Sequence, residues 1–163
     1  MITSGRPIFY KQERVGQGGR VFRMWKFRSM KRDAEAATGP IWASFHDERC
    51  TKFGDWLRRT NIDELPQLFN VLKGDMNIVG PRPEQPTIFV YLREQIEGYQ
   101  RRQRVRPGIT GWAQINQGYD TSVDDVRRKV HYDLEYIRRQ STLEDLKIMW
   151  RTVPVMVLRR GSM

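Results

Sequence analysis

The sequence contains very little cysteine and histidine. Cys50 is the one cysteine among 163 residues, which excludes an internal disulfide and fits a reducing compartment. The two histidines, His46 and His131, do not combine with Cys50 in the spacing of a zinc site. Domains stabilised by disulfides or by structural zinc are therefore excluded.

Long apolar runs are also missing. No run approaches the ~20 residues of a membrane-spanning helix, and the N-terminus lacks the apolar core of a signal peptide. The length suits one domain of ordinary size, and no repeat, low-complexity segment or linker divides it. We therefore expect residues 1–163 to form a single domain.

Positive charge is in excess. Lys and Arg number 29 against 19 Asp and Glu, a formal net charge of +10. The arginine-rich runs lie at 58–59, 101–106, 127–129, 138–139 and 159–160. Such a surface attracts nucleic acid, an anionic membrane face or the phosphates of a nucleotide, and composition leaves all three open.

The residue patterns predict an α+β fold with more helix than strand. Alternation around a Gly-Gln-Gly-Gly turn at 16–19 predicts an N-terminal β-hairpin over residues 7–30. No Lys-Ser/Thr follows that turn, so we do not interpret it as a phosphate-binding loop. Helical spacing predicts several amphipathic helices: 47–59, 65–72, 88–104, about 120–137, and from 141 until Pro154 kinks or ends it. Residues 31–46 read as irregular, and 106–117 as a shaped loop or short strand.

The central stretch from Arg59 to Glu84 organises the rest. It holds Asp63-Glu64, a short apolar helix pattern and Gly-Pro-Arg-Pro at 80–83. The apolar positions are Leu65, Leu68, Phe69, Val71 and Leu72. Pro66 suits the first turn of a helix, which places the two carboxylates at or just before its start. Either both carboxylates face one pocket there, or Asp63 merely caps the helix.

Three further segments accompany this stretch in a fixed order. They are Lys-Phe-Arg-Ser-Met at 26–30, Arg-Pro-Gly-Ile-Thr-Gly-Trp-Ala-Gln at 106–114, and Ser-Thr-Leu-Glu-Asp-Leu-Lys at 141–147. With all four, the sequence resembles the bacterial sugar transferases, the monotopic phosphoglycosyl transferases, from about residue 5 to 160. The resemblance implies a catalytic domain at the cytoplasmic face of the bacterial inner membrane. The family's apolar N-terminal membrane segment is absent, so we expect this chain to be soluble or peripheral.

The resemblance also implies a reaction. A sugar 1-phosphate passes from a UDP-sugar to polyprenyl (undecaprenyl) phosphate through a covalent aspartyl-phosphosugar intermediate, releasing UMP and initiating polysaccharide or glycoconjugate synthesis. By position, Asp63 is the nucleophile and Glu64 its acid–base partner. Which of the two has the raised pKa stays open. Mg2+ is the expected metal, with Asp63 as its protein ligand.

Basic side chains are the candidates for binding the diphosphate. Lys26 and Arg28 are expected on one strand face, and Arg82 is held between two prolines. Without the family likeness, Lys26 and Arg28 would fit an ordinary exposed strand equally well. Arg106 is a further candidate phosphate contact.

Two acidic and two aromatic residues are weaker candidates. Asp145 matches an acidic position in the family, and Asp133 is an alternative for the same role. Each also fits a solvated helix carboxylate. Trp112 and Tyr119 would either stack on a base or pack in the core, and we favour packing.

The expected partners are a UDP-sugar, polyprenyl phosphate and an anionic membrane face that the helix arginines contact. The oligomeric state stays open, a homo-oligomer included. The alternative function is a basic nucleic-acid-binding module without catalysis, whose binding would depend steeply on salt. Against that alternative, the sequence has no helix-turn-helix, zinc or ribonucleoprotein signature.

Overall fold

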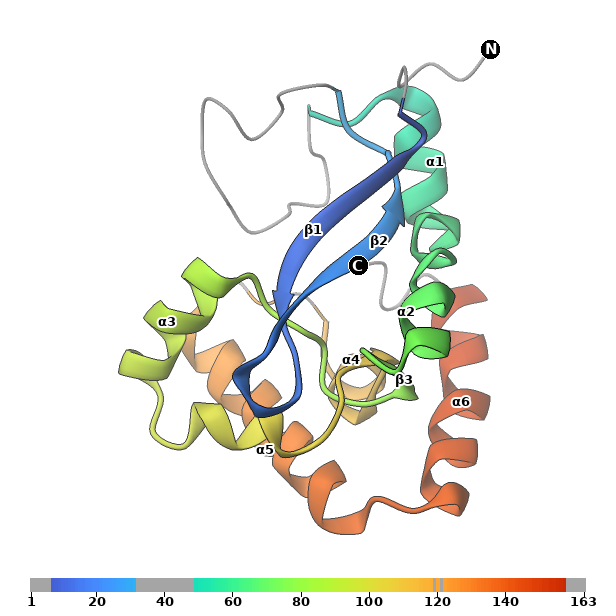
Figure 1. The fold of residues 1–163 in the computed structure, drawn as a ribbon. Coiled ribbons are helices and arrows are strands. Elements are labelled where there is room, and N and C mark those ends of the chain that lie inside the picture. Colours follow the sequence, from blue (N-terminus) through green and yellow to red (C-terminus); the bar gives the residue numbers. More distant parts are fainter. Residues whose placement is uncertain (1–6, 32–48, 119, 121, 158–163) are drawn as a thin grey trace.

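The computed structural model describes residues 7–31, 49–118, 120 and 122–157, and Figure 1 shows their arrangement. Two predictions lie outside the described residues: the irregular segment at 31–46, apart from residue 31, and the role of Tyr119. The helices and strands after the N-terminal hairpin are α1 (Lys52–Arg59), η2 (Ile62–Glu64), α2 (Gln67–Lys73), β3 (Asn77–Val79), α3 (Pro86–Gln95), η3 (Tyr99–Arg104), β4 (Gly108–Thr110), α4 (Trp112–Asn116), α5 (Val123–Arg139) and α6 (Thr142–Val157). The predicted α+β class with more helix than strand is confirmed.

The N-terminal hairpin forms as predicted. Strands β1 (Phe9–Val15) and β2 (Val21–Phe27) are antiparallel, with Phe9 opposite Phe27. The turn is a short 3-10 segment, η1 (Gln17–Gly19), in which Gly18 has a φ of 64°. That left-handed conformation favours glycine, which explains the glycine-rich turn.

Four predictions differ, wholly or in part, from the structure. The predicted 47–59 helix starts later, at α1, where the Thr51 hydroxyl accepts a hydrogen bond from the amide of Gly54. The expected single helix over 88–104 is wrong, because Gly98 adopts a φ of 75° and separates α3 from η3. The 106–117 segment contains the predicted short strand, β4, and also α4, which was not predicted. Of the two outcomes predicted at Pro154, an end of the helix is excluded, because α6 continues to Val157.

A second, parallel strand pair lies near the centre. Strand β3 pairs with β4, Asn77 opposite Gly108 and Val79 opposite Thr110. Glycine lets the backbones approach closely beside this pair: a Cβ on Gly80 would lie 2.5 Å from the carbonyl oxygen of Arg106. This pair fixes the start of the loop 80–84, which matters for the site below.

Two apolar clusters form the core. One joins α3, η3 and α5 and consists of Leu92, Ile96, Tyr99, Val126 and Val130. The other joins β3, α5 and α6 and consists of Val79, Tyr136 and Ile148, with Trp112 packed against it. Each fully buried large side chain contributes about 1.5–3 kcal/mol, so these clusters are the main source of stability.

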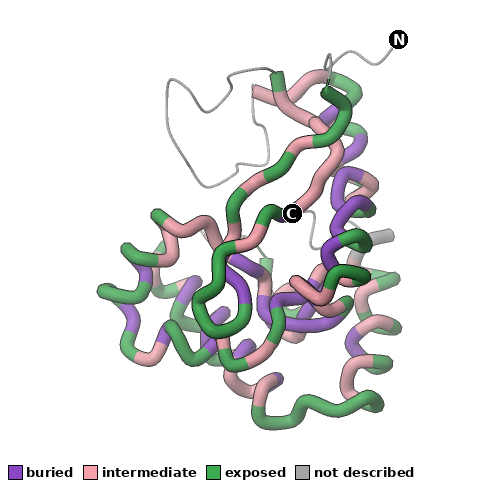
Figure 2. The backbone as a smooth tube through the Cα atoms, in the orientation of Figure 1, coloured by how far each residue is buried: buried purple, intermediate pink, exposed green. Residues whose placement is uncertain are grey.

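Helix α2 buries the opposite side from the one its apolar pattern suggests. Gln67 and Asn70 are 1% and 0% exposed, whereas Leu72 is 84% exposed. Figure 2 shows buried and exposed positions following one another along this part of the chain. The helix therefore turns its polar side toward β2 and its apolar side outward.

Candidate active site

Asp63 and Glu64 lie in their own 3-10 turn, η2, just before α2. Asn61 precedes the turn with a left-handed φ of 53°, a conformation that asparagine tolerates better than most residues. The residue at the N-cap of α2 is Pro66, and no side chain caps that helix. The interpretation of Asp63 as a helix cap is therefore wrong, while its predicted place just before the helix is confirmed.

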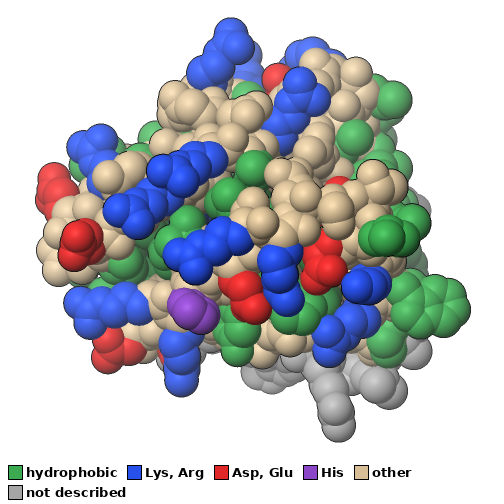
Figure 3. All heavy atoms as spheres, turned by 90° about the horizontal axis from the view of Figure 1, so that it is seen from below, with side chains coloured by type: hydrophobic (Ala, Val, Ile, Leu, Met, Phe, Trp, Pro, Cys, Tyr) green, Lys and Arg blue, Asp and Glu red, His purple; other side chains and the backbone are tan. Residues whose placement is uncertain are grey.

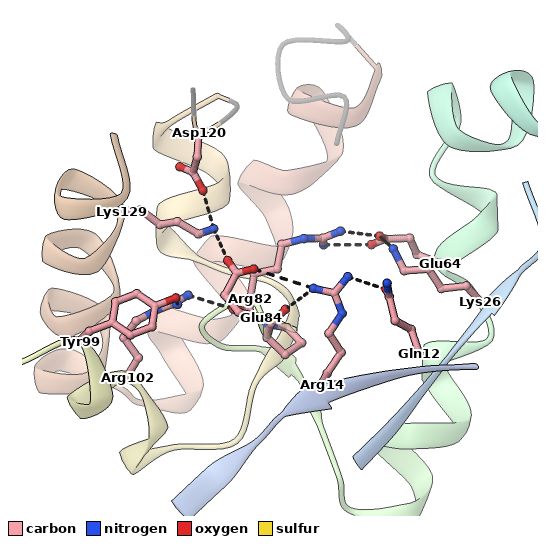
Figure 4. Close-up of polar contacts among 11 residues, drawn as sticks. Gln12, Arg14, Lys26, Glu64, Arg82, Glu84, Tyr99, Arg102, Asp120 and Lys129 are labelled. Carbon is pink, nitrogen blue, oxygen red and sulfur yellow. Dashed lines mark hydrogen bonds and ion pairs between the residues drawn. The ribbon is translucent and has the colours of Figure 1, made fainter. Parts of the chain in front are cut away.

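Glu64 is held by two cations. Its Oε1 accepts hydrogen bonds from Nζ of Lys26 at 2.8 Å and from Nη2 of Arg82 at 2.7 Å, and its Oε2 accepts one from Nη1 of Arg82 at 3.3 Å. Figure 4 shows the three side chains converging from β2, η2 and the loop 80–84. Burial alone would raise the pKa of Glu64, but the charges and hydrogen bonds of Arg82 and Lys26 outweigh it and lower that pKa far below its usual range.

Asp63 has a different environment although it is the next residue. It is 6% exposed, and within the described part of the chain its carboxylate forms no ion pair. Burial, the largest cause, and the charge of Glu64 raise the pKa of Asp63, the charges of Lys26 and Arg82 lower it, and the net result is a pKa of about 6. The pKa values of the two carboxylates thus move apart, and Asp63 is the raised one.

Of the four basic candidates, only Lys26 and Arg82 reach the carboxylates. Arg28 follows β2 and turns away: its Nε donates to the carbonyl oxygen of Pro7 at 3.0 Å, and its guanidinium lies over the ring of Tyr10. Arg106 lies against Gly74 at the far end of α2, where a Cβ on residue 74 would be 3.8 Å from its Nη1. The structure therefore separates the four into a pair bound to Glu64 and two residues that make other contacts.

The backbone of Arg82 is held by charged side chains that the sequence did not single out. Arg102 donates from Nη2 to the carbonyl oxygen of Arg82 at 2.9 Å and from Nε to Oδ2 of Asp133 at 2.6 Å. Arg14 donates to the carbonyl oxygen of Pro83 at 3.0 Å. Asp133 is thus a buried partner of Arg102 and not a solvated helix carboxylate. Nothing in the arginine-rich run at 101–106 distinguishes Arg102 from its neighbours, which is why the sequence pattern missed it.

Asp145 contacts Tyr136 of α5, whose hydroxyl also reaches the strand that leads into the same loop. Its Oδ1 accepts a hydrogen bond from the hydroxyl of Tyr136 at 2.8 Å, and that hydroxyl lies 3.3 Å from the carbonyl oxygen of Val79. Asp145 is therefore connected to β3 through Tyr136. Trp112 packs in the second cluster, with its Nε1 donating to Glu135 and the guanidinium of Arg139 5.0 Å from its ring, as the packing interpretation expects.

Glu84 anchors the other end of the loop 80–84. It accepts from Nζ of Lys129 at 2.9 Å and lies 3.9 Å from Nη1 of Arg14, while Lys129 also donates to Asp120 at 2.7 Å. Burial alone would raise the pKa of Glu84, but the nearby cations, Lys129 first, lower it to about 2. The ionised carboxylate is therefore favoured in the folded state.

Glu84→Gln is expected to lower the free energy of unfolding by about 2 kcal/mol at pH 7, because two buried cations lose a counter-charge. Since folding lowers this pKa from 4.5, the contribution is present above pH 4.5 and is lost as pH falls through about 2. Urea unfolding of both proteins at pH 7 and pH 2.5 measures it. The exposed Glu97→Gln is the matched control. A stability difference equally large at both pH values would contradict the assignment.

Asp63 and Glu64 are the two carboxylates at the site that could bind a metal ion. Among the described residues, no group of three or more His, Cys, Asp or Glu side chains is arranged to hold a metal ion. Glu64 already accepts from two cations, whereas the Asp63 carboxylate is buried without one. Mg2+ is commonly bound by one or two carboxylates together with substrate phosphates, so Asp63 fits that role and Glu64 does not.

The comparisons with known proteins agree with the motif order. The sequence profile of the family described as bacterial sugar transferase matches residues 1–159. A UDP-N-acetylgalactosamine-undecaprenyl-phosphate N-acetylgalactosaminephosphotransferase from Aeromonas hydrophila is 44% identical over 99% of this chain and 38% of its own length. A UDP-glucose:undecaprenyl-phosphate glucose-1-phosphate transferase from Escherichia coli K12 is 46% identical over 93% of this chain and 33% of its own.

A third relative extends the same pattern. An undecaprenyl-phosphate glucose phosphotransferase from Komagataeibacter xylinus is 45% identical over 99% of this chain and 31% of its own length. The chain thus spans about a third of each of these three relatives. All three are named as transferases, and they give no support to the nucleic-acid-binding alternative. With the profile matching nearly its whole length, the chain belongs to the bacterial sugar transferase family.

Proposed function

We propose that this domain transfers a sugar 1-phosphate from a UDP-sugar to polyprenyl phosphate, with Asp63 as the nucleophile. The observation that carries the proposal is the contrast within Asp63-Glu64. Glu64 is neutralised by Lys26 and Arg82, while Asp63 lies beside the same two cations without pairing to either. One carboxylate oxygen is therefore available to form a bond.

Two displacements at phosphorus complete the reaction. An Asp63 oxygen bonds to the sugar-linked phosphorus of the UDP-sugar, the bond from that phosphorus to the bridging oxygen breaks, and UMP leaves with that oxygen. A phosphate oxygen of the polyprenyl phosphate then bonds to the same phosphorus and the bond to Asp63 breaks, which restores the carboxylate. In both steps, Lys26 and Arg82 supply positive charge near the reacting phosphate, which is the main requirement of phosphoryl transfer.

Glu64 acts mainly through its charge in this proposal. Its low pKa makes it a poor general base, so it keeps Lys26 and Arg82 together next to Asp63. Mg2+, held by Asp63 together with the diphosphate oxygens, would supply further charge neutralisation at the leaving group.

The experiment is a turnover assay on a panel of donors. The protein is incubated with Mg2+, polyprenyl phosphate and each of UDP-glucose, UDP-galactose and UDP-N-acetylgalactosamine, and UMP is measured. We expect release with at least one donor and a polyprenyl diphosphate sugar as product. No UMP from any donor, combined with tight and salt-dependent DNA or RNA binding by filter assay, would instead support the nucleic-acid-binding alternative.

A membrane surface is the second proposed partner. Of the helices in the described residues, none has the length and apolar character for a membrane crossing. Exposed apolar side chains instead gather on α1, α2, β3 and α6, where they include Phe53, Trp56, Leu65, Leu68, Phe69, Leu72, Ile78, Leu143, Leu146, Trp150 and Val153. Figure 1 places α1, α2 and α6 along one side of the molecule, and both α2 and α6 contact β3. Such a large apolar surface beside η2 suits the headgroup region where a lipid phosphate would be presented.

On the face that Figure 3 shows, the basic side chains do not form a continuous surface of their own. On the face in Figure 3, Lys and Arg side chains are dispersed, with acidic and hydrophobic side chains between them. Hydrophobic side chains stand out at the right-hand edge of that view, on the side of α6 in Figure 1. We therefore assign membrane contact first to the apolar surface and only second to the helix arginines that the sequence suggested.

The double variant Leu72→Glu/Trp150→Glu is expected to bind anionic phospholipid vesicles at least about tenfold more weakly. Leu72 and Trp150 are 84% and 81% exposed, and moving them from water into the membrane surface is favourable. The glutamates in the variant do not provide this favourable free energy of transfer. Co-sedimentation with phosphatidylglycerol-containing vesicles measures it. Val90→Glu/Tyr91→Glu, which adds the same two charges at 46% and 51% exposed positions on α3, is the control and is expected to bind normally. Equal binding by Leu72→Glu/Trp150→Glu and the parent would exclude this surface.

A further inference from the structure

Asn70 is the most deeply buried polar residue of α2. Its exposed fraction is 0%, on a helix whose neighbouring apolar side chains Leu68 and Phe69 are 46% and 56% exposed. Burying a primary amide is unfavourable unless its hydrogen bonds are made. The burial of the Asn70 side chain must therefore be explained by its hydrogen bonds and not by apolar packing.

The Asn70 amide is bonded to the backbone of β2. Its Oδ1 accepts from the amide of Trp25 at 3.0 Å, and its Nδ2 donates to the carbonyl oxygen of Arg23 at 2.9 Å. Nδ2 also lies 3.2 Å from Oδ2 of Asp75, a second acceptor just beyond α2. The nitrogen and the oxygen of the Asn70 amide are thus directed at three groups outside the helix.

These backbone groups belong to the free edge of the hairpin. The amide of Arg28 donates to the carbonyl oxygen of Ile8 on the β1 side, so alternate residues of β2 face β1 and the residues between them face away. Arg23 and Trp25 are the latter, with an N–H and a C=O that β1 does not pair. One amide side chain supplies both a donor and an acceptor, and so replaces a third strand at this edge.

The two hydrogen bonds join β2, which carries Lys26, to α2, which follows the turn that carries Asp63 and Glu64. Lys26 follows Trp25 on β2, and Glu64 lies on η2, six residues before Asn70 and directly ahead of α2. The ammonium of Lys26 meets Glu64 at 2.8 Å, so a shift of β2 along α2 by one ångström would weaken that contact appreciably. We propose that Asn70 is a positioning residue, which fixes the hairpin on α2 so that Lys26 reaches Glu64 beside Asp63.

The chemistry predicts which replacements fail. Aspartate keeps the acceptor for Trp25 but loses the donor to Arg23 and adds a second carboxylate near Asp75. Leucine has similar volume but loses both hydrogen bonds to β2. The catalytic consequence depends on the proposed function, whereas the structural consequence does not, and the two are tested separately.

The catalytic test is a double-mutant cycle with four proteins: the parent, Asn70→Asp, Lys26→Met and the double variant. We expect Asn70→Asp to lower kcat at least about tenfold in the parent background and less than threefold in the Lys26→Met background, because Asn70 acts through Lys26. Val130→Ala, in the other apolar cluster, is the control for lost stability and is expected to keep kcat within threefold of the parent. Equal effects of Asn70→Asp in both backgrounds would overturn the proposal.

The structural test does not require turnover. In Asn70→Leu, amide exchange at Trp25 is expected to accelerate at least tenfold while the amide of Arg28, bonded to β1, keeps its protection. The side-chain ammonium NMR signal of Lys26 should be lost in Asn70→Leu and retained in Val130→Ala. Unchanged Trp25 exchange and a retained Lys26 signal would overturn the proposal. If the parent releases no UMP but these two signals change as expected, the proposed function fails and the positioning role stands.

Discussion

Asp63→Asn is expected to lower the rate of UMP release by a factor of about 10^3 or more. An amide cannot form the bond to phosphorus that the two-step transfer requires, and the loss of a group that acts covalently has effects of this size. Since burial disfavours the ionised form of Asp63, removing its charge is not expected to lower the free energy of unfolding. A large loss of activity in a protein that unfolds normally is therefore the expected result.

Two measurements check this expectation together. UMP is followed with the donor that the parent uses, and mass spectrometry follows the mass of one sugar phosphate on the peptide that contains residue 63, with polyprenyl phosphate left out. The parent should carry the adduct and the variant should not. Asp124→Asn, at a side chain that is 81% exposed, is the control. If Asp63→Asn released UMP within tenfold of the parent rate, Asp63 would not be the nucleophile.

Glu64→Gln is expected to reduce both activity and stability, which distinguishes it from its neighbour. Glutamine keeps the shape of the side chain but removes the counter-charge of Lys26 and Arg82, which then repel each other in a largely buried position. We expect the free energy of unfolding to fall by about 3 kcal/mol and kcat to fall about 100-fold, as the two cations move apart beside Asp63. Urea unfolding and the UMP assay measure the two effects.

The repulsion between Lys26 and Arg82 in Glu64→Gln leads to a second prediction for the same site. Adding Lys26→Met to Glu64→Gln removes one of the two like charges, so the double variant should regain part of the stability that Glu64→Gln lost. It should not regain activity. Glu13→Gln, on an exposed position of β1, is the control and should match the parent in both assays. A stability of Glu64→Gln equal to that of the control would show that the two cations do not depend on Glu64.

Much of the architecture followed from local patterns. The hairpin was predicted from alternation and a glycine-rich turn, and α5 from apolar spacing, since both depend on neighbouring residues. The break between α3 and η3 was missed because helical spacing continues past Gly98, whose left-handed φ only the folded chain reveals. Strand β3 was missed because its three residues gain their order from a parallel partner about thirty positions away.

The sequence by itself determined the family, the order of its motifs and the adjacent carboxylates Asp63 and Glu64. Only the tertiary structure decided that these neighbours differ, because the two cations come from positions 38 residues before and 18 residues after Glu64. It likewise decided that α2 turns its amides inward, against the free edge of β2, and its leucines outward. The physical reason is the same in each case: a charge or a hydrogen bond is satisfied by whichever group folding brings within about 3 Å, and that distance is not encoded by separation along the chain.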